Sequence, residues 1–190
     1  MKNIIKILFV VYIFLFPIKS FALIEVDITR GNLNPLPVAV SALSSSEKDK
    51  KSLENKLNVK NLGLEISKIV ENNLRQSGLF NPLNKDAFLQ KPDIAHLKPR
   101  FEDWALIKAQ ALITGKVNLQ DDKLRVEFRL WDVLAGKEML ALAFTTVPKN
   151  WRRVGHIISD KVYERLTGEK GYFDTRVIYV SEQGPKTQRI

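Results

Sequence analysis

Cysteine is absent from the 190 residues, and histidine occurs only twice. The lack of cysteine excludes disulfides, thiolate metal sites, a catalytic thiol and a lipidated N-terminal cysteine. Two histidines supply few of the ligands that a zinc site requires. The nine glycines form no phosphate-binding loop. The composition therefore gives no support for a metalloenzyme, a thiol enzyme or a nucleotide-binding protein, and we expect no metal and no cofactor.

Long apolar runs are also scarce, and the one near the N-terminus covers only residues 7–18, between Lys6 and Lys19. A membrane-spanning helix needs about 20 apolar residues, so an uncleaved anchor is the less favoured alternative. The basic start, the short apolar run and the small residues in Ser20–Ala22 are typical of a secretory signal peptide cleaved after Ala22. We therefore predict export to the periplasm of a mature chain that begins at Leu23 and does not insert stably into a membrane.

The formal net charge is +9, but three of the 30 basic residues lie in the predicted signal peptide. An exported basic protein meets acidic proteins and anionic envelope polymers rather than nucleic acid. We therefore expect protein partners and no nucleic-acid binding.

Apolar spacing in the mature chain predicts a compact α/β (α+β sandwich) fold over residues 23–168, a mixed sheet with helices packed on it. The predicted strands are Ile24–Ile28, Pro37–Leu43, 111–119, 123–130 and 139–147, and the predicted helices are 62–77, 100–108 and 151–167. Polar composition predicts a solvated loop over Ser44–Lys60, an extended exit over Leu79–Leu83 and irregular structure over 84–99. Asn61, Gly78 and Gly168 have the residue types expected at helix ends.

Two faces of these helices are expected to be buried. In the last helix Val154, Ile158, Val162 and Leu166 recur at four-residue steps. In the short helix 100–108 we predict that Phe101, Trp104 and Ala105 face inward.

The two ends of the mature chain carry further predictions. Ile24–Ile28 alternates apolar and acidic residues. It can add to the sheet of a partner by β-augmentation or complete the chain's own sheet, and the sequence leaves both open. Thr175–Val180 has the pattern of a strand that only a turn and five residues follow. We therefore expect 169–190 to be a hinge and the first strand of another domain, in either a naturally truncated protein or a partial sequence.

His156, Ser159 and Asp160 form the one cluster with catalytic residue types. A secreted hydrolase would need a nucleophile within reach of the histidine and an oxyanion hole. All three residues lie within one predicted helix without an exposed turn around Ser159. Structural hydrogen bonds are therefore the favoured interpretation, and a hydrolase is the alternative.

Three segments together resemble the TolB family of the periplasmic Tol–Pal envelope system. They are Leu74–Leu83, the meander with Gly115–Val117 and Leu130–Asp132, and Trp151–Asp160 continuing through Tyr163–Arg176. The resemblance covers essentially the whole mature chain, in the order of the family, after a signal peptide.

The resemblance implies a non-enzymatic adaptor with an N-terminal α/β domain and a β-propeller, of which only the beginning would be present here. In that family the mature N-terminal segment binds TolA, which implies TolA contacts for Ile24, Glu25, Val26, Asp27 and Ile28. The propeller binds Pal, so Pal binding would require the missing part. The system supports outer-membrane integrity and constriction during cell division, and bacteriocins use it for import. Trp151, Arg152, His156 and Asp160 are expected to support the hinge between the domains.

Overall fold

A five-stranded mixed sheet runs through residues 34–175, the part of the chain that the computed structural model describes. The strands are β1 (Leu36–Val40), β2 (Phe80–Pro82), β3 (Ala111–Gln120), β4 (Lys123–Asp132) and β5 (Lys137–Thr146), in the spatial order β2-β1-β3-β4-β5. β1 pairs in parallel with both β2 and β3, whereas β3, β4 and β5 form an antiparallel meander. The predicted mixed sheet and its three-stranded meander are confirmed.

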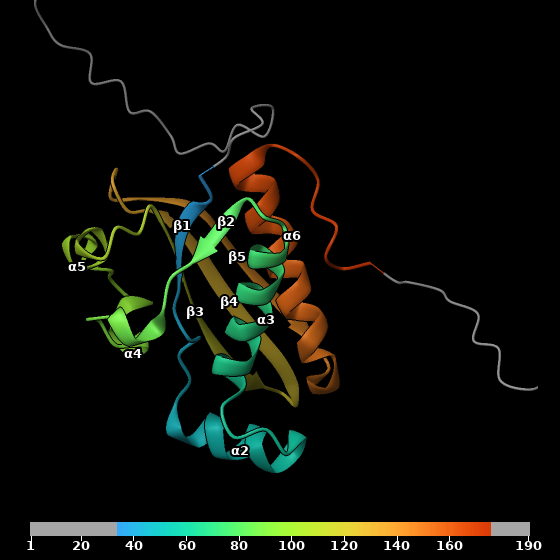
Figure 1. The fold of residues 1–190 in the computed structure, drawn as a ribbon. Coiled ribbons are helices and arrows are strands. Elements are labelled where there is room, and N and C mark those ends of the chain that lie inside the picture. The colour runs from blue at the N-terminus through green and yellow to red at the C-terminus, as the bar shows by residue number, and fades with distance from the viewer. Residues whose placement is uncertain (1–33, 176–190) are drawn as a thin grey trace, which may run out of the picture.

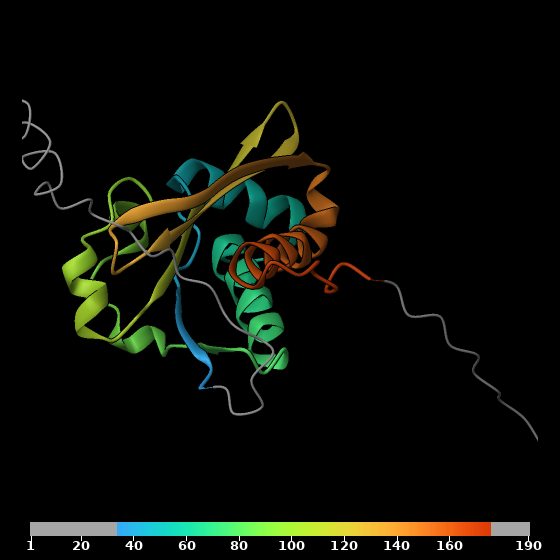
Figure 2. The ribbon, with the colours of Figure 1, turned by 90° about the horizontal axis from the view of Figure 1, so that it is seen from above.

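Helices lie on both sides of this sheet. They are α2 (Glu47–Leu57), α3 (Leu62–Gln76), α4 (Pro92–Ala95), α5 (Phe101–Leu106) and α6 (Trp151–Thr167), with short 3-10 helices η1 (Lys85–Ala87) and η2 (Pro148–Asn150). Figures 1 and 2 show α3 and α6 side by side on one face, with α4 and α5 away from this pair. On the opposite face, Phe101 of α5 contacts the ring of Trp131 at the end of β4, with ring centres 5.8 Å apart.

The main core lies between the sheet and the α3–α6 pair. All four residues of the predicted α6 stripe are at most 2% exposed, and they pack with inward residues of the meander such as Val117 and Phe128. A smaller core on the opposite face gathers Trp104 of α5 with Ala39 of β1 and Leu112 of β3. Trp104 is 1% exposed and its indole N–H donates to Gln90 Oε1 at 3.1 Å.

The helix ends follow the sequence prediction. Asn61 Oδ1 accepts a hydrogen bond from the backbone N–H of Leu64 at 3.1 Å, which caps α3. Gly78 and Gly168 follow α3 and α6 with φ of +74° and +76°, a region that glycine enters without a Cβ penalty.

The prediction of a solvated loop over Ser44–Lys60 is wrong, because α2 occupies most of it. Ser46 caps this helix through a 3.1 Å hydrogen bond from the Asp49 N–H. Asp49 Oδ1 also accepts from the Leu119 N–H of β3 at 3.2 Å. Leu53 is only 1% exposed. The helix buries so few apolar residues that its composition hides the amphipathic pattern, and its caps and good helix formers sustain it.

Two further expectations need correction. Leu79–Leu83 is not merely an extended exit, since Phe80–Pro82 forms edge strand β2 parallel to β1. Pro82 fits there because an edge strand leaves one row of backbone groups without a ladder partner. Ala105 is exposed and does not face inward.

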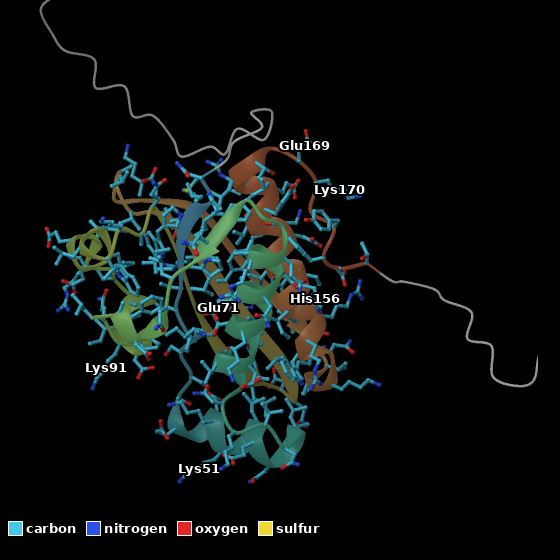
Figure 3. All side chains as sticks on the ribbon, in the orientation of Figure 1. Lys51, Glu71, Lys91, His156, Glu169 and Lys170 are labelled. Carbon is cyan, nitrogen blue, oxygen red and sulfur yellow. The ribbon has the colours of Figure 1, made fainter. Side chains whose placement is uncertain are left out.

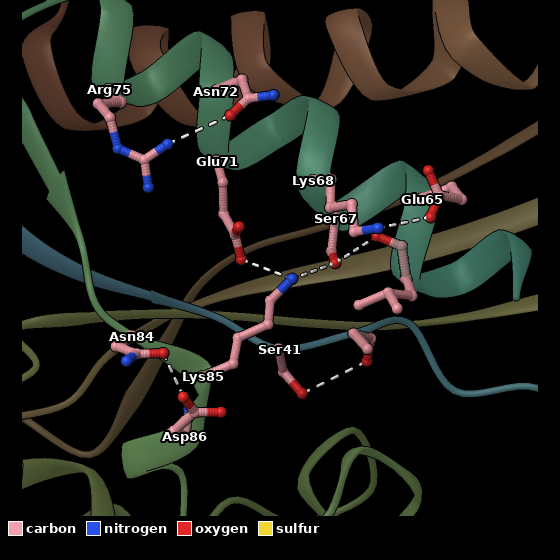
Figure 4. Close-up of polar contacts among 12 residues, drawn as sticks. Ser41, Glu65, Ser67, Lys68, Glu71, Asn72, Arg75, Asn84, Lys85 and Asp86 are labelled. Atoms are coloured by element: carbon pink, nitrogen blue, oxygen red, sulfur yellow. Dashed lines mark hydrogen bonds and ion pairs between the residues drawn. The ribbon is translucent and has the colours of Figure 1, made fainter.

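The 84–99 region contains η1 and α4 and is otherwise irregular. Figure 4 shows how its first turn is fixed to α3. The Lys85 ammonium lies 2.7 Å from Glu71 Oε1 and donates to Ser67 Oγ at 3.0 Å. This pair is partly buried on both sides, and it holds the chain that leaves β2 against the helix.

Candidate functional site

The predicted partner segment Ile24–Ile28 lies outside the described residues, as do the signal peptide and most of the predicted strand Thr175–Val180. The structure therefore positions only the second set of predicted site residues, Trp151, Arg152, His156 and Asp160. All four belong to α6, and their surroundings differ along the helix.

Trp151 and Arg152 lie at the start of α6. The Arg152 guanidinium carbon is 4.3 Å from the centre of the Trp151 ring, a cation–π contact. Trp151 is 5% exposed, so the ring is also part of the main core. Both residues line a shallow depression of about 350 Å³ together with the α2–α3 connection, residues 58–61. The start of α6 therefore lies next to that connection.

His156 and Ser159 meet a residue that the sequence analysis missed, Asn73 of α3. The Asn73 side-chain nitrogen lies 2.9 Å from His156 Nδ1 and 2.9 Å from Ser159 Oγ. It carries two hydrogens, so one can donate to Ser159 Oγ while the other faces His156 Nδ1. Asn73 stands three residues after buried Val70 on the apolar stripe of α3. Because buried polar side chains are usually hydrogen-bonded, a polar residue on the apolar stripe of α3 could have predicted a bond to a neighbouring helix.

The same contacts argue against the hydrolase alternative. Ser159 is 0% exposed, and its hydroxyl donates to the Gly155 carbonyl at 2.9 Å. The hydroxyl is thus buried and engaged with the backbone, while the His156 ring is engaged with Asn73. A nucleophile must reach both its base and the substrate, and this arrangement offers neither. Within residues 34–175, no three acidic, histidine or cysteine side chains are grouped to hold a metal ion.

Asp160 holds the segment that follows α6. Its carboxylate oxygens accept hydrogen bonds from the backbone N–H groups of Phe173 at 2.6 Å and Asp174 at 3.1 Å. Gly171 lies so close that a Cβ there would be 2.4 Å from the Asp160 Cα. A side chain at Gly171 would therefore push the segment off the helix. We call residues 171–174 and Asp160 the α6 clamp.

Two further contacts reinforce the α6 clamp. Arg153 donates to both carboxylate oxygens of Asp174, with distances of 3.0–3.1 Å. This hydrogen-bonded pair raises the pKa of the Arg153 guanidinium above its usual value. Tyr163 of α6 contacts the rings of Tyr172 and Phe173 edge to face, at 5.5 and 5.9 Å. Burial raises the pKa of the Tyr163 phenol, with smaller contributions from Tyr172 and Glu169.

The four predicted α6 residues therefore serve three local tasks and do not form one site. Trp151 and Asp160 are nine residues apart, about 14 Å along a helix. Of these four residues, Asp160 contacts residues 171–174, and the support of a hinge between domains stays a prediction. Arg153 and Tyr163 of α6 also contact that segment, through Asp174 and through the rings of Tyr172 and Phe173, and neither was selected from the sequence.

Comparison with known proteins connects this architecture to a family. The TolB amino-terminal domain family matches residues 24–139, more than half of the chain. The chain belongs to the TolB family. This confirms the family that the sequence resembles, and its matched range includes the predicted partner segment.

A curated TolB-family relative and a solved structure support the assignment. The chain is 76% identical over 186 residues to the Tol-Pal system protein TolB of Pelagibacter ubique (strain HTCC1062), covering 98% of this chain and 42% of that protein. The crystal structure of TolB from Acinetobacter baumannii has a TM-score of 0.58 at 20% identity, covering 78% of this chain and 32% of that one. At that identity the solved structure supports the fold alone, which is the predicted α/β fold. The chain spans less than half of the length of either relative.

Within the described residues, none of the helices has both the length and the apolar character needed to cross a membrane.

Proposed function

We propose that this chain is the partner-binding N-terminal part of a periplasmic, non-enzymatic Tol–Pal adaptor. The observation that carries the proposal is the 76% identity to a Tol-Pal system protein over nearly the whole chain. The signal-like N-terminus, with cleavage after Ala22, is consistent with export. Residues 23–168 would be the folded domain, and 169–190 the hinge and the beginning of a propeller.

In this proposal Ile24, Glu25, Val26, Asp27 and Ile28 bind TolA as an added strand. Their alternation of apolar and acidic side chains suits an edge pairing in which one face is buried and the other solvated. The backbone would supply affinity through ladder hydrogen bonds, while the two acidic residues would select a basic partner surface.

Further roles of the family would depend on parts of the relatives that lie outside the 190 residues given. Pal binding would require the propeller. Support of outer-membrane integrity, constriction during cell division and use by bacteriocins for import would follow from bridging TolA and Pal. The α6 clamp would then orient the hinge that joins the TolA-facing and Pal-facing parts.

Titration calorimetry with the C-terminal domain of TolA tests the proposal. The mature chain should bind, and deletion of residues 23–28 should weaken binding by at least about tenfold, because the added strand is lost. Glu25→Gln with Asp27→Asn keeps the strand and removes its charge, so it should weaken binding less than the deletion. Equal affinity with and without residues 23–28 would refute the proposed TolA site.

A further inference from the structure

A polar hollow of about 250 Å³ opens on the sheet face away from the α3–α6 pair, beside α4. It is lined by His96, Leu97, Gly115, Lys116, Glu127 and Arg129. Lys116 and Glu127 face each other across the β3–β4 ladder. The hollow is therefore built by the sheet and by the loop after α4, and it is separate from the α6 clamp.

The polar groups of this hollow are incompletely paired. His96 Nδ1 is buried and has no hydrogen-bond partner within the described residues. Lys116 likewise forms no ion pair there. Arg129 forms an ion pair with Glu138 at 3.6 Å, which is too long for a hydrogen bond, and its guanidinium carbon lies 5.9 Å from the centre of the Trp131 ring. A buried polar atom without a partner is costly. The two cations that line the same hollow favour an anion as its ligand.

The one carboxylate in the hollow is already neutralised. Arg125 donates to Glu127 Oε1 at 2.8 Å. Nearby Asp93 accepts a hydrogen bond from Ser44 at 2.8 Å. Lys116 therefore remains available for an incoming acid, and Arg129 can add to it because its pair with Glu138 is long. The cross-strand neighbours of Arg129 and Glu127 on β5 are the small residues Ala141 and Ala143.

One apolar side chain, Leu97, lines the hollow, and a second, Ile94 of α4, lies two residues before His96. Leu97 is 71% exposed and Ile94 of α4 is 53% exposed. An acidic residue held by the cations would place its neighbours near these two side chains. The pairing of basic and apolar groups thus fits a segment in which acidic and apolar residues lie close together.

We propose that this hollow is a second docking site, which binds a carboxylate side chain in an extended acidic segment of a partner protein. Lys116 and Arg129 hold the carboxylate, and Ile94 and Leu97 contact the apolar residues next to it. The site is independent of residues 24–28 and goes beyond the proposed TolA contact.

The test is an NMR titration of the isotope-labelled chain with the peptide acetyl-Leu-Glu-Leu-Asp-Leu-amide. We expect amide shift changes confined to residues 94–97, 115–117 and 127–129. Lys116→Gln and Arg129→Gln should each raise the Kd about tenfold, the loss expected for one charge-assisted hydrogen bond. The control Lys170→Gln removes the same charge far from α4, beyond the end of α6 (Figure 3), and should leave the Kd unchanged.

Three outcomes would overturn the docking site. An equal weakening by Lys170→Gln would mean diffuse attraction to a basic protein. Equal binding of acetyl-Leu-Gln-Leu-Asn-Leu-amide would mean that no carboxylate is recognised. Matching shift changes caused by Glu25→Gln with Asp27→Asn, in the absence of peptide, would mean that the chain's own acidic segment fills the hollow.

Discussion

Replacement of Asp160 by alanine should release residues 171–174 from α6 while the domain stays folded. Two hydrogen bonds from backbone N–H groups to a charged acceptor would be worth about 3–6 kcal/mol if nothing replaced them. Both bonds are only part-buried. In the variant, water can hydrogen-bond to the two freed N–H groups and offset much of this free energy. We therefore expect a net local loss of about 2 kcal/mol. The Phe173 ring and the Arg153–Asp174 pair still hold the segment in part.

Native-state hydrogen exchange measures this loss directly. A local loss of about 2 kcal/mol should accelerate exchange at the Phe173 and Asp174 amides about 30-fold. Amides in the middle of β3 should exchange as in the unmodified chain. Glu164→Gln is the matched control, because Glu164 lies on the same helix and pairs with Lys161 at the exposed surface.

Either of two results would refute the reasoning about the α6 clamp. Unchanged protection of both amides in Asp160→Ala would mean that the two hydrogen bonds contribute nothing. A uniform loss of protection across α6 and the sheet would mean that Asp160 stabilises the whole domain rather than the segment after α6.

Three further predictions concern the packing of the domain. Leu53→Ala should destabilise the chain by about 3 kcal/mol in urea unfolding, because the side chain of Leu53 is buried. The control Leu106→Ala, at an exposed position, should change stability by less than about 0.5 kcal/mol. Equal effects would mean that α2 does not pack on the rest of the domain. Gly63→Ala should cost about 3 kcal/mol or more in the same assay, because its Cβ would lie 1.9 Å from the Leu43 carbonyl oxygen; a stable variant would contradict that contact. The raised pKa of Tyr163 means that its stabilising contribution is complete below about pH 10 and declines as pH rises through the folded pKa. In an alkaline titration, Tyr163→Phe should therefore unfold at a higher pH than the unmodified chain. If both chains lost stability with pH in the same way, burial of the Tyr163 phenol would not be the cause.

The sequence predicted the elements whose apolar residues follow a regular period. The meander and the helices α3 and α6 each bury a continuous stripe, so spacing alone identified them. α2 was missed because few of its residues are apolar, so it has no clear helical spacing of apolar residues. Its N-terminus is instead stabilised by the cap between Ser46 and Asp49. β2 was missed because a three-residue strand containing Pro82 becomes a strand only through its pairing with β1.

The candidate site was predictable only in part, for a related reason. The α6 residues were selected by chemical type and by resemblance, and their partners lie far away in the chain. Asn73 is 83 residues from His156, and the amides that Asp160 binds come from a segment without a pattern of its own. The hollow beside α4 is formed by residues of two strands and of the loop after α4. No spacing of residues within one segment predicts it. Tertiary contacts of this kind become visible only when the topology is known.

The central proposal is that TolA binds residues 24–28 and not the surfaces of residues 34–175. An NMR titration of the labelled mature chain with the unlabelled C-terminal domain of TolA tests it most directly. We predict shift changes and line broadening concentrated at residues 24–28, with the amides around Lys116 and Asp160 unchanged. Shift changes concentrated on the surfaces of residues 34–175, with residues 24–28 unaffected, would contradict the claim.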